Sequence, residues 1–235
     1  MATQVLYAEP YPLEVVLSRT ALLLIDFQND FCSPGGWADL AGLDLRRVAQ
    51  AIPPARAVLE AARRARLPII HTREGHLPDL SDCPAGKQRK MRRTGFAYGM
   101  EVPQGRLFIR GTWNNDIIPA LTPLPGEPVI DKPGKGAFYS TGLEGLLRDR
   151  GVDTLLVCGL TTHVCVASTL REAADRGFDT ALVADGCQSY EAPLHEGALE
   201  VLRMPAALFG WLTSSAHVLP FLEGAASPRP RHAPS

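Results

Sequence analysis

The sequence lacks the features that define several large classes of protein. Its 24 Lys and Arg residues balance 25 Asp and Glu residues, so there is no excess charge to attract nucleic acid or an anionic membrane. No apolar run is long enough to cross a bilayer, and residues 1–19 show no signal-peptide pattern. With 235 residues, 46% of them hydrophobic, the chain is expected to be a soluble globular protein of the cytoplasm with no nucleic-acid or membrane partner.

Cysteine and lysine are scarce. The five cysteines form no C-x-x-C pair, and their odd number gives no disulfide framework, which fits a reducing compartment. In such a compartment a thiol is either inert core or a nucleophile. There are only four lysines, so each can be considered individually: Lys87, Lys90, Lys132 and Lys135.

Short apolar runs alternate with segments of helical periodicity. The runs predict strands at 20–25, 68–72, 129–131, 154–158, 180–184 and 207–209. The periodic segments predict helices at 43–66, with a break at Pro53-Pro54, and at 141–150, 163–176, 194–203 and 214–222. This order predicts a single α/β domain, a three-layer sandwich with a mostly parallel sheet and helices on both faces.

The flanks and one long connection fall outside this pattern. We expect an extended N-terminal arm at 1–18, the α/β domain at 19–222 and a disordered tail at 223–235. Residues 73–126 are rich in Gly, Pro and charge, and a connection of this length inside a compact domain is usually functional.

Three residues stand where predicted strands end, which is where parallel sheets place their active sites. Asp26 and Lys132 end two strands, and Cys165 begins the helix that follows a third. A helix N-terminus and a nearby ammonium favour thiolate, and a carboxylate can carry the proton to a leaving amine. Such a group predicts an amide-cleaving enzyme without metal or cofactor. The alternative is a core thiol and a turn-forming Asp.

Three segments resemble motifs of the isochorismatase-like cysteine hydrolases: Leu24–Phe31, Asp131–Phe138 and Gly159–Val166. They follow the order and spacing of that family, and the resemblance extends from about residue 19 to residue 222. The family includes nicotinamidase, isochorismatase and amidohydrolases of biuret, ureidoacrylate and N-carbamoylsarcosine.

The resemblance implies a role for each matching residue. Asp26 would be the general base and acid, Lys132 its charge partner, and Cys165 the nucleophile. A cis peptide would join Leu160 to Thr161 and aim the Thr161 N–H, with that of Cys165, at the developing oxyanion. Family members are commonly dimers or tetramers, so a homo-oligomer is expected.

Within the family, segments 71–76, 78–80, 113–119, 131–136 and 171–177 are most similar to biuret and triuret hydrolases. The implied reaction is hydrolysis of a C–N bond in a small ureide, with ammonia released through a thioester-type acyl-enzyme. Two departures, His163 in place of Asp and Pro205-Ala206 in place of Gln-Gly, leave the identity of the ureide open. The alternatives are another amidase of this fold or a member without catalysis.

Other features are given lesser roles. Phe31 and Phe138 follow motif residues and either line the substrate pocket or belong to the core. His71 and His76 are assigned to the substrate loop and not to a metal site, because the Asp-x-His arrangement of metal-binding relatives is missing. The basic segment 87–93 is read as a solvated or subunit-facing surface.

The remaining cysteines and the lysine-containing turn have no assigned chemistry. Segment 133–137 is read as a turn because it fails the Walker A pattern. Cys158 and Cys187 are read as structural thiols, and Cys32 and Cys83 have no role.

Overall fold

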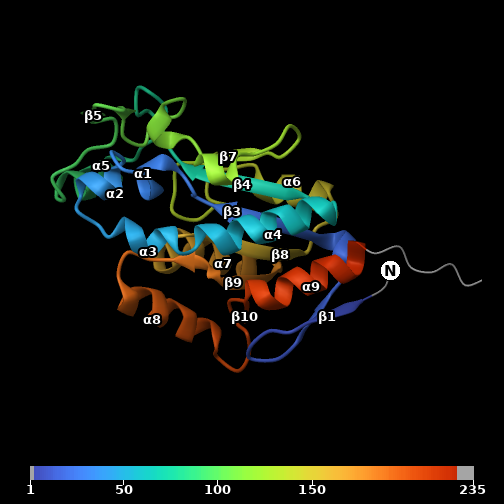
Figure 1. Cartoon of the computed structure of the whole chain (residues 1–235). Coiled ribbons are helices and arrows are strands. Elements are labelled where there is room, and N and C mark those ends of the chain that lie inside the picture. Colours follow the sequence, from blue (N-terminus) through green and yellow to red (C-terminus); the bar gives the residue numbers. More distant parts are fainter. Residues whose placement is uncertain (1–2, 227–235) are drawn as a thin grey trace, which may run out of the picture.

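A six-stranded, wholly parallel sheet forms the centre of the molecule in a computed structural model that describes residues 3–226 (Figure 1). Its strand order is β10-β9-β8-β3-β4-β7. The strands are β3 (Thr20–Ile25), β4 (Ile69–Glu74), β7 (Val129–Lys132), β8 (Thr154–Leu160), β9 (Asp179–Gln188) and β10 (Trp211–Thr213). The predicted α/β class with a parallel sheet is therefore confirmed.

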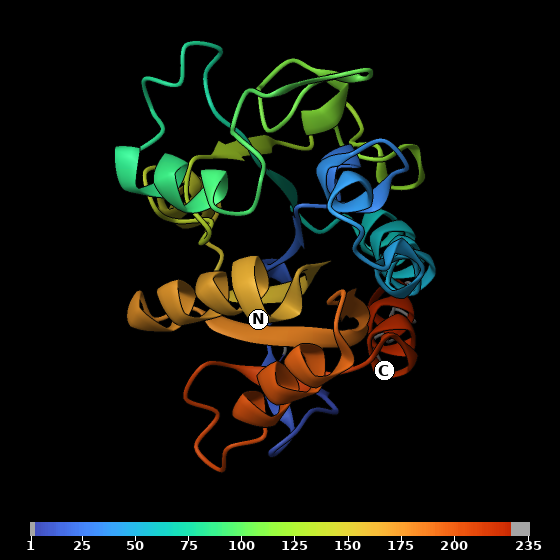
Figure 2. The ribbon, with the colours of Figure 1, turned by 90° about the vertical axis from the view of Figure 1, so that its left-hand side faces the viewer.

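Helices cover both faces of this sheet, which gives the predicted three layers (Figure 2). One face is covered by α3 (Leu45–Ala49), α4 (Ile52–Arg64) and α9 (Ser215–Ala226). The other is covered by α6 (Leu143–Asp149), α7 (Ala167–Asp175) and α8 (Ala192–Leu202). As expected, the first long helical segment is broken before its prolines, which occupy the first turn of α4.

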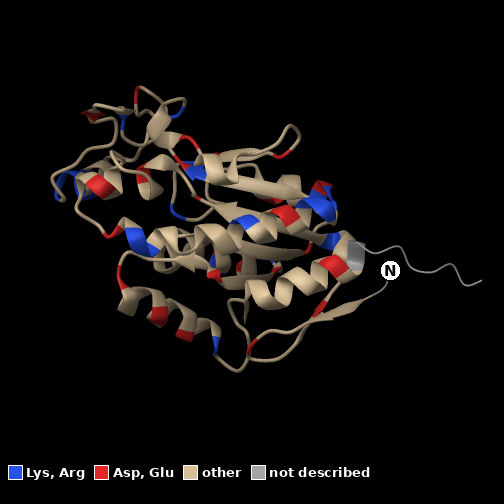
Figure 3. Ribbon diagram, in the orientation of Figure 1, with Lys and Arg blue, Asp and Glu red and all other residues tan. Residues whose placement is uncertain are grey.

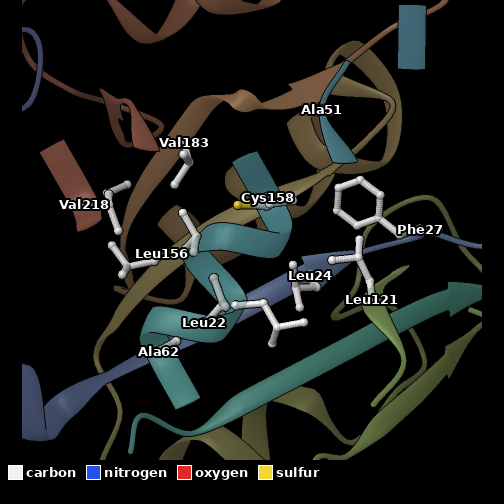
Figure 4. Packing of buried hydrophobic residues seen from close by; sticks show 14 of the residues in the cluster. Leu22, Leu24, Phe27, Ala51, Ala62, Leu121, Leu156, Cys158, Val183 and Val218 are labelled. Carbon is white, nitrogen blue, oxygen red and sulfur yellow. The ribbon is translucent and has the colours of Figure 1, made fainter. Parts of the chain in front are cut away.

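Successive residues of β3 point to opposite faces, because side chains alternate along a strand. Leu22 and Leu24 pack with α4 and α9, together with Leu156 and Val218 (Figure 4). Leu23 and Ile25 belong to the second core, beneath α6, α7 and α8. Burial on both faces explains why β3 is apolar without interruption.

The long connection between β4 and β7 covers one end of the sheet, beside α1 (Asn29–Cys32) and α2 (Trp37–Leu40) (Figure 1). It contains α5 (Ala85–Arg92), the short hairpin of β5 (Glu101–Val102) and β6 (Gly105–Arg106), and the turns η2 (Trp113–Asn115) and η3 (Pro119–Leu121). β3, β4, β7 and β8 all end beneath this connection, and the site is built there.

Several predicted boundaries are wrong. The N-terminal arm is a hairpin of β1 (Gln4–Leu6) and β2 (Leu13–Val15), followed by the turn η1 (Leu17–Arg19). Its inward side chains, including Leu13 and Val15, are buried against α9 and β10. The segment is therefore a strand pair whose alternate side chains are buried, and not the predicted extended arm over the surface.

The predicted strand 207–209 is a turn, since Ala207 has a positive φ of 48°, and the strand begins at Trp211. The tail also starts later than expected, because α9 continues to Ala226; positions 227–235 lie outside the described residues. Within 3–226, no helix is long and apolar enough to cross a membrane.

Candidate active site

Asp26 is the residue that directly follows β3, and its side chain is fully buried. Its φ of 55° turns the chain sharply at the end of the strand. Oδ1 accepts a hydrogen bond from Thr72 Oγ1 at 2.7 Å, and Oδ2 lies 2.8 Å from Lys132 Nζ. The neighbouring strands β4 and β7 thus fix both oxygens of one carboxylate.

Lys132 ends β7 and is also fully buried. Its ammonium donates to the carbonyl oxygens of Gly134 and Lys135, both at 3.0 Å, in addition to the Asp26 contact. Burial works against this charge, but the negative groups around it, Asp26 foremost, together outweigh burial and raise the pKa of Lys132. The predicted pairing of Asp26 with Lys132 is therefore present as a buried ion pair.

Cys165 lies in a wide first turn, η4 (Thr162–Val166), that leads from β8 into α7. The peptide between Leu160 and Thr161 is cis, as the family resemblance implied. Cys165 is 3% exposed, and its thiol lies 3.9 Å from Glu74 Oε2. Its sulfur, one carboxylate oxygen of Asp26 and one of Glu74 all lie within 4.8 Å of one another. The structure thus brings the three predicted catalytic residues together.

The protonation of the thiol differs from the prediction. Burial raises the pKa of Cys165 to about 12, and Lys132 offsets this only in part, while Asp26 and Glu74 add to the rise. Lys132 thus favours the thiolate, as expected, but burial outweighs its effect, and the thiol is protonated at neutral pH. A nucleophilic role for this thiol would therefore require an adjacent carboxylate to accept its proton.

Sequence reasoning missed Glu74, which ends β4 and is fully buried beside the thiol. Two ammoniums contact it, Lys87 Nζ at 2.7 Å and Lys135 Nζ at 2.8 Å, and the Tyr98 hydroxyl donates to it at 3.3 Å. Burial would raise the pKa of Glu74, but the lysines lower it well below its usual range. Glu74 is thus held firmly in its ionised form.

The reading of segment 87–93 as surface is wrong for its first residue. Lys87, on α5, points inward to Glu74 and also lies 3.0 Å from His76 Nε2, with only 17% of its side chain exposed. The turn lysine Lys135 likewise belongs to the site. Three of the four lysines therefore surround two carboxylates, and their scarcity was the signal that could have identified them.

A cavity of about 450 Å³ opens above Cys165. Its polar lining includes Glu74, Lys135 and Thr161, and Phe31 also lines it, as expected. Phe138, the other aromatic considered for the pocket, does not: it is buried in the core against Phe178 and the Arg176 guanidinium. Thr161 borders the cavity where an oxyanion would form, and the predicted oxyanion hole stays a prediction.

The two positions that depart from biuret hydrolases have different surroundings. His163 lines the cavity, and its Nδ1 lies 2.9 Å from Ser189 Oγ. Pro205 is in the turn between α8 and β10 and is not among the described residues that line the cavity. Of these two, only His163 can contact a substrate directly.

The two histidines assigned to the substrate loop are each paired with a carboxylate, and the assignment is wrong for His71, which lies within β4. His71 Nε2 lies 3.3 Å from Glu127, and His76 Nδ1 lies 3.1 Å from Asp82. Neither is among the described residues that border the cavity. The donor atoms of Asp26, Glu74 and Cys165 are close enough to share a metal ion, but three ammoniums already contact the two carboxylates.

The other four thiols are free and lie outside this group. Cys158 lies within β8 and Cys187 within β9, both buried in the core as expected of structural thiols. Cys32 and Cys83 are also unpaired. Cys165 is the only cysteine among the described residues that line the cavity.

Comparison with known proteins agrees with this geometry. The isochorismatase domain model matches residues 20–217. The chain belongs to the isochorismatase family. The motif resemblance predicted this membership, and the match covers the whole sheet and every residue of the site.

Named relatives of this isochorismatase-family chain include two ureidoacrylate amidohydrolases RutB. The protein from Methylorubrum extorquens AM1 is 34% identical over 213 residues, which cover 89% of this chain and 85% of the relative. That from Azorhizobium caulinodans is 30% identical over 217 residues, covering 89% and 92%. The activity in these names belongs to those proteins.

Solved structures share the fold. A cysteine hydrolase from Pseudomonas syringae pv. phaseolicola superimposes with a TM-score of 0.76 at 24% identity, covering 96% of this chain and all of the other. N-carbamoylsarcosine amidase from Thermoplasma acidophilum gives a TM-score of 0.64 at 24% identity, covering 84% and 96%. At this identity the likeness establishes the fold alone.

Proposed function

We propose that the protein is a cysteine amidohydrolase that releases ammonia from the terminal carbamoyl group of a small ureide. The observation that carries the proposal is the meeting of a buried thiol, a lysine-paired carboxylate and a second carboxylate within 4.8 Å of one another. The thiol and the second carboxylate line one cavity. The relatives named as ureidoacrylate amidohydrolases support a ureide substrate. The resemblance to biuret and triuret hydrolases supports the same class but leaves its member open.

The reaction begins with proton transfer from the Cys165 thiol to Asp26 as Sγ attacks the carbonyl carbon. Asp26 is the more suitable acceptor, because Glu74 has two ammonium contacts and Asp26 has one. The carbonyl oxygen gains the negative charge, and the N–H groups of Thr161 and Cys165 would stabilise it. The C–N bond then breaks, and ammonia leaves with the proton from Asp26, which gives a carbamoyl thioester.

Water completes the cycle. It adds to the thioester carbon and gives a proton to Asp26; the C–S bond breaks, and the sulfur recovers that proton. Lys132 stays charged throughout and holds Asp26 in place, because its raised pKa prevents it from giving up a proton at neutral pH. The carbamate product R–NH–COOH leaves, and the thiol is restored.

Glu74 and Lys135 are suited to bind the ureide itself. A carboxylate accepts the N–H groups of the carbamoyl amide, and an ammonium donates to a second carbonyl oxygen. Both side chains line the cavity beside Cys165, and the ion pair between them sets their relative position. A planar ureide offers this alternation of donors and acceptors along one edge.

The test is ammonia release from biuret, triuret, ureidoacrylate, N-carbamoylsarcosine and nicotinamide, with the wild-type protein and Cys165→Ser. We expect turnover of at least one ureide and loss of at least about 10³-fold in the variant. A circular dichroism spectrum shared by both proteins controls for folding. Equal rates in the two proteins would exclude the cysteine mechanism, and turnover of nicotinamide alone would exclude the ureide class.

A further inference from the structure

The cavity above Cys165 is larger and more apolar than a bare ureide requires. Its volume of about 450 Å³ is within the range of sites for drug-sized ligands, whereas biuret has seven non-hydrogen atoms. The polar groups next to the thiol occupy one end. The rest of the lining includes apolar side chains from three separate parts of the chain: Trp37, Ala41 and Leu43 in and after α2, Phe96 after α5, and Leu194 on α8.

Burial distinguishes the two ends of this cavity. Glu74 and Cys165 are 0% and 3% exposed, so the reacting end is deep. Leu194 is 46% exposed, and Trp37 and Phe96 are half-buried, so the apolar side chains form the mouth. Partly exposed apolar side chains gathered around one opening mark a binding surface. We define the apolar rim as Trp37, Ala41, Leu43, Phe96 and Leu194.

The charges of the lining limit what can occupy the mouth. Among the described residues that line the cavity, Lys135 is the only Lys or Arg, and it is bound to both oxygens of Glu74 beside the thiol. Near the rim, Glu191 is exposed and acidic, and α8 carries further acidic side chains (red in Figure 3). Burial lowers the pKa of His163, so this side chain is neutral near pH 7.

The position of the thiol fixes the orientation of a substrate. The carbamoyl group must lie at Cys165, next to Glu74 and Lys135, so any substituent extends toward the apolar rim. A carboxylate at that end would meet Glu191 and, among the described residues that line the cavity, no Lys or Arg besides Lys135. An alkyl or aryl group would instead lose its water against Trp37 and Leu194. We infer that this cavity selects ureides with an uncharged apolar substituent over ureides that are unsubstituted or end in a carboxylate.

This inference rests on the proposed function and can be tested with three acylureas that share one reacting carbamoyl group. Acetylurea has almost no substituent, isovalerylurea ends in an isopropyl group, and malonurate places a carboxylate where isovalerylurea has that isopropyl group. We expect kcat/KM for isovalerylurea to exceed that of each of the other two by at least about tenfold.

Two variants locate the preference. Leu194→Ser should lower the ratio of kcat/KM for isovalerylurea over acetylurea by about three- to tenfold, because it removes apolar area from the rim. Leu208→Ser is the matched control: Leu208 is 60% exposed in the turn before β10, outside the cavity, and its substitution should leave that ratio unchanged. Glu191→Lys should raise kcat/KM for malonurate by about tenfold.

The outcomes separate the inference from the function on which it rests. Equal kcat/KM for the three acylureas, or a preference for malonurate, would overturn the inference and leave the amidohydrolase intact. No ammonia from any of them or from biuret and triuret would overturn both. A Leu194→Ser protein with a changed oligomeric state and an unchanged ratio would assign the apolar rim to a contact between subunits and overturn the inference.

Discussion

Asp26 and Glu74 are two buried carboxylates at the ends of neighbouring parallel strands, yet their surroundings differ. Asp26 has one ammonium, Lys132, and the hydroxyl of Thr72. Glu74 has two ammoniums, from Lys87 and Lys135. The number of cations around a carboxylate sets how readily it accepts a proton. In the proposed mechanism, the same place at the edge of the sheet thus serves a proton acceptor in one strand and a fixed anion in the next.

The most severe test of this difference is removal of each carboxylate in turn. Asp26→Asn should lower kcat for ammonia release by about 10³-fold, because no other group at the thiol is as suitable a base. Glu74→Gln should cost only about 10- to 100-fold, with more of the loss in KM, since it weakens binding of the ureide. Steady-state kinetics on one ureide measure both effects.

The double variant Asp26→Asn with Cys165→Ser is the control for the kcat loss expected of Asp26→Asn. Because Asp26 and Cys165 act as a unit, the double variant should be no slower than either single variant. A larger kcat loss for Glu74→Gln than for Asp26→Asn would reverse the two roles.

Stability gives the second test, with a smaller effect. Lys132→Met leaves Asp26 buried without a cation and should lower the free energy of unfolding by about 3–5 kcal/mol. Lys87→Met should cost about 1–2 kcal/mol, because Glu74 keeps Lys135. Urea unfolding followed by circular dichroism measures both, and Lys90→Met, on the exposed face of α5, should change the value by less than about 0.5 kcal/mol. An equal loss of unfolding free energy in Lys132→Met and Lys87→Met would mean that Lys135 alone does not stabilise the buried Glu74 carboxylate.

The pH dependence of thiol alkylation is the mildest test. Since burial raises the pKa of Cys165 to about 12, the protonated thiol dominates at neutral pH. The thiolate fraction should therefore grow about tenfold with each pH unit between pH 7 and 10, and the iodoacetamide rate at Cys165 with it. Peptide mass spectrometry, with Cys165→Ser as the blank, follows the site.

Substitutions at Glu74 and at Lys132, the partner of Asp26, should change the rate of Cys165 alkylation in opposite directions. Glu74→Gln removes a negative charge that raises the pKa of Cys165, so alkylation at pH 8 should accelerate several-fold. Lys132→Met removes a cation that lowers the pKa of Cys165, so alkylation should slow. A wild-type rate that stays constant from pH 6 to 9 would contradict the neutral resting thiol.

The sequence predicted the Asp26 region well and the Glu74 region poorly, for a physical reason. Asp26 follows a continuous apolar run that can only be a doubly buried strand, so its place at the sheet edge follows from the pattern. Glu74 also ends a strand, but β4 carries polar residues near its end, His71 to Arg73, which hide the boundary.

Lys87 could not be found in this way. It lies in a basic segment that looks like a solvated surface, and its partner Glu74 is 13 positions away across a connection without periodicity. Only the path of that connection over the end of the sheet turns Lys87 inward. Phe138 shows the opposite error: it follows a motif residue, but its ring packs into the core and not into the cavity.

By itself the sequence determined the α/β order of elements, the family and the three residues of the Asp26–Lys132–Cys165 group, because apolar runs and motif spacing are local properties of the chain. The tertiary structure alone decided the protonation of the thiol, the two lysines on Glu74 and the apolar rim of the cavity. These depend on burial and on contacts between segments far apart in the chain. Neither can be read from local pattern, since desolvation and Coulomb attraction are set by neighbours in space.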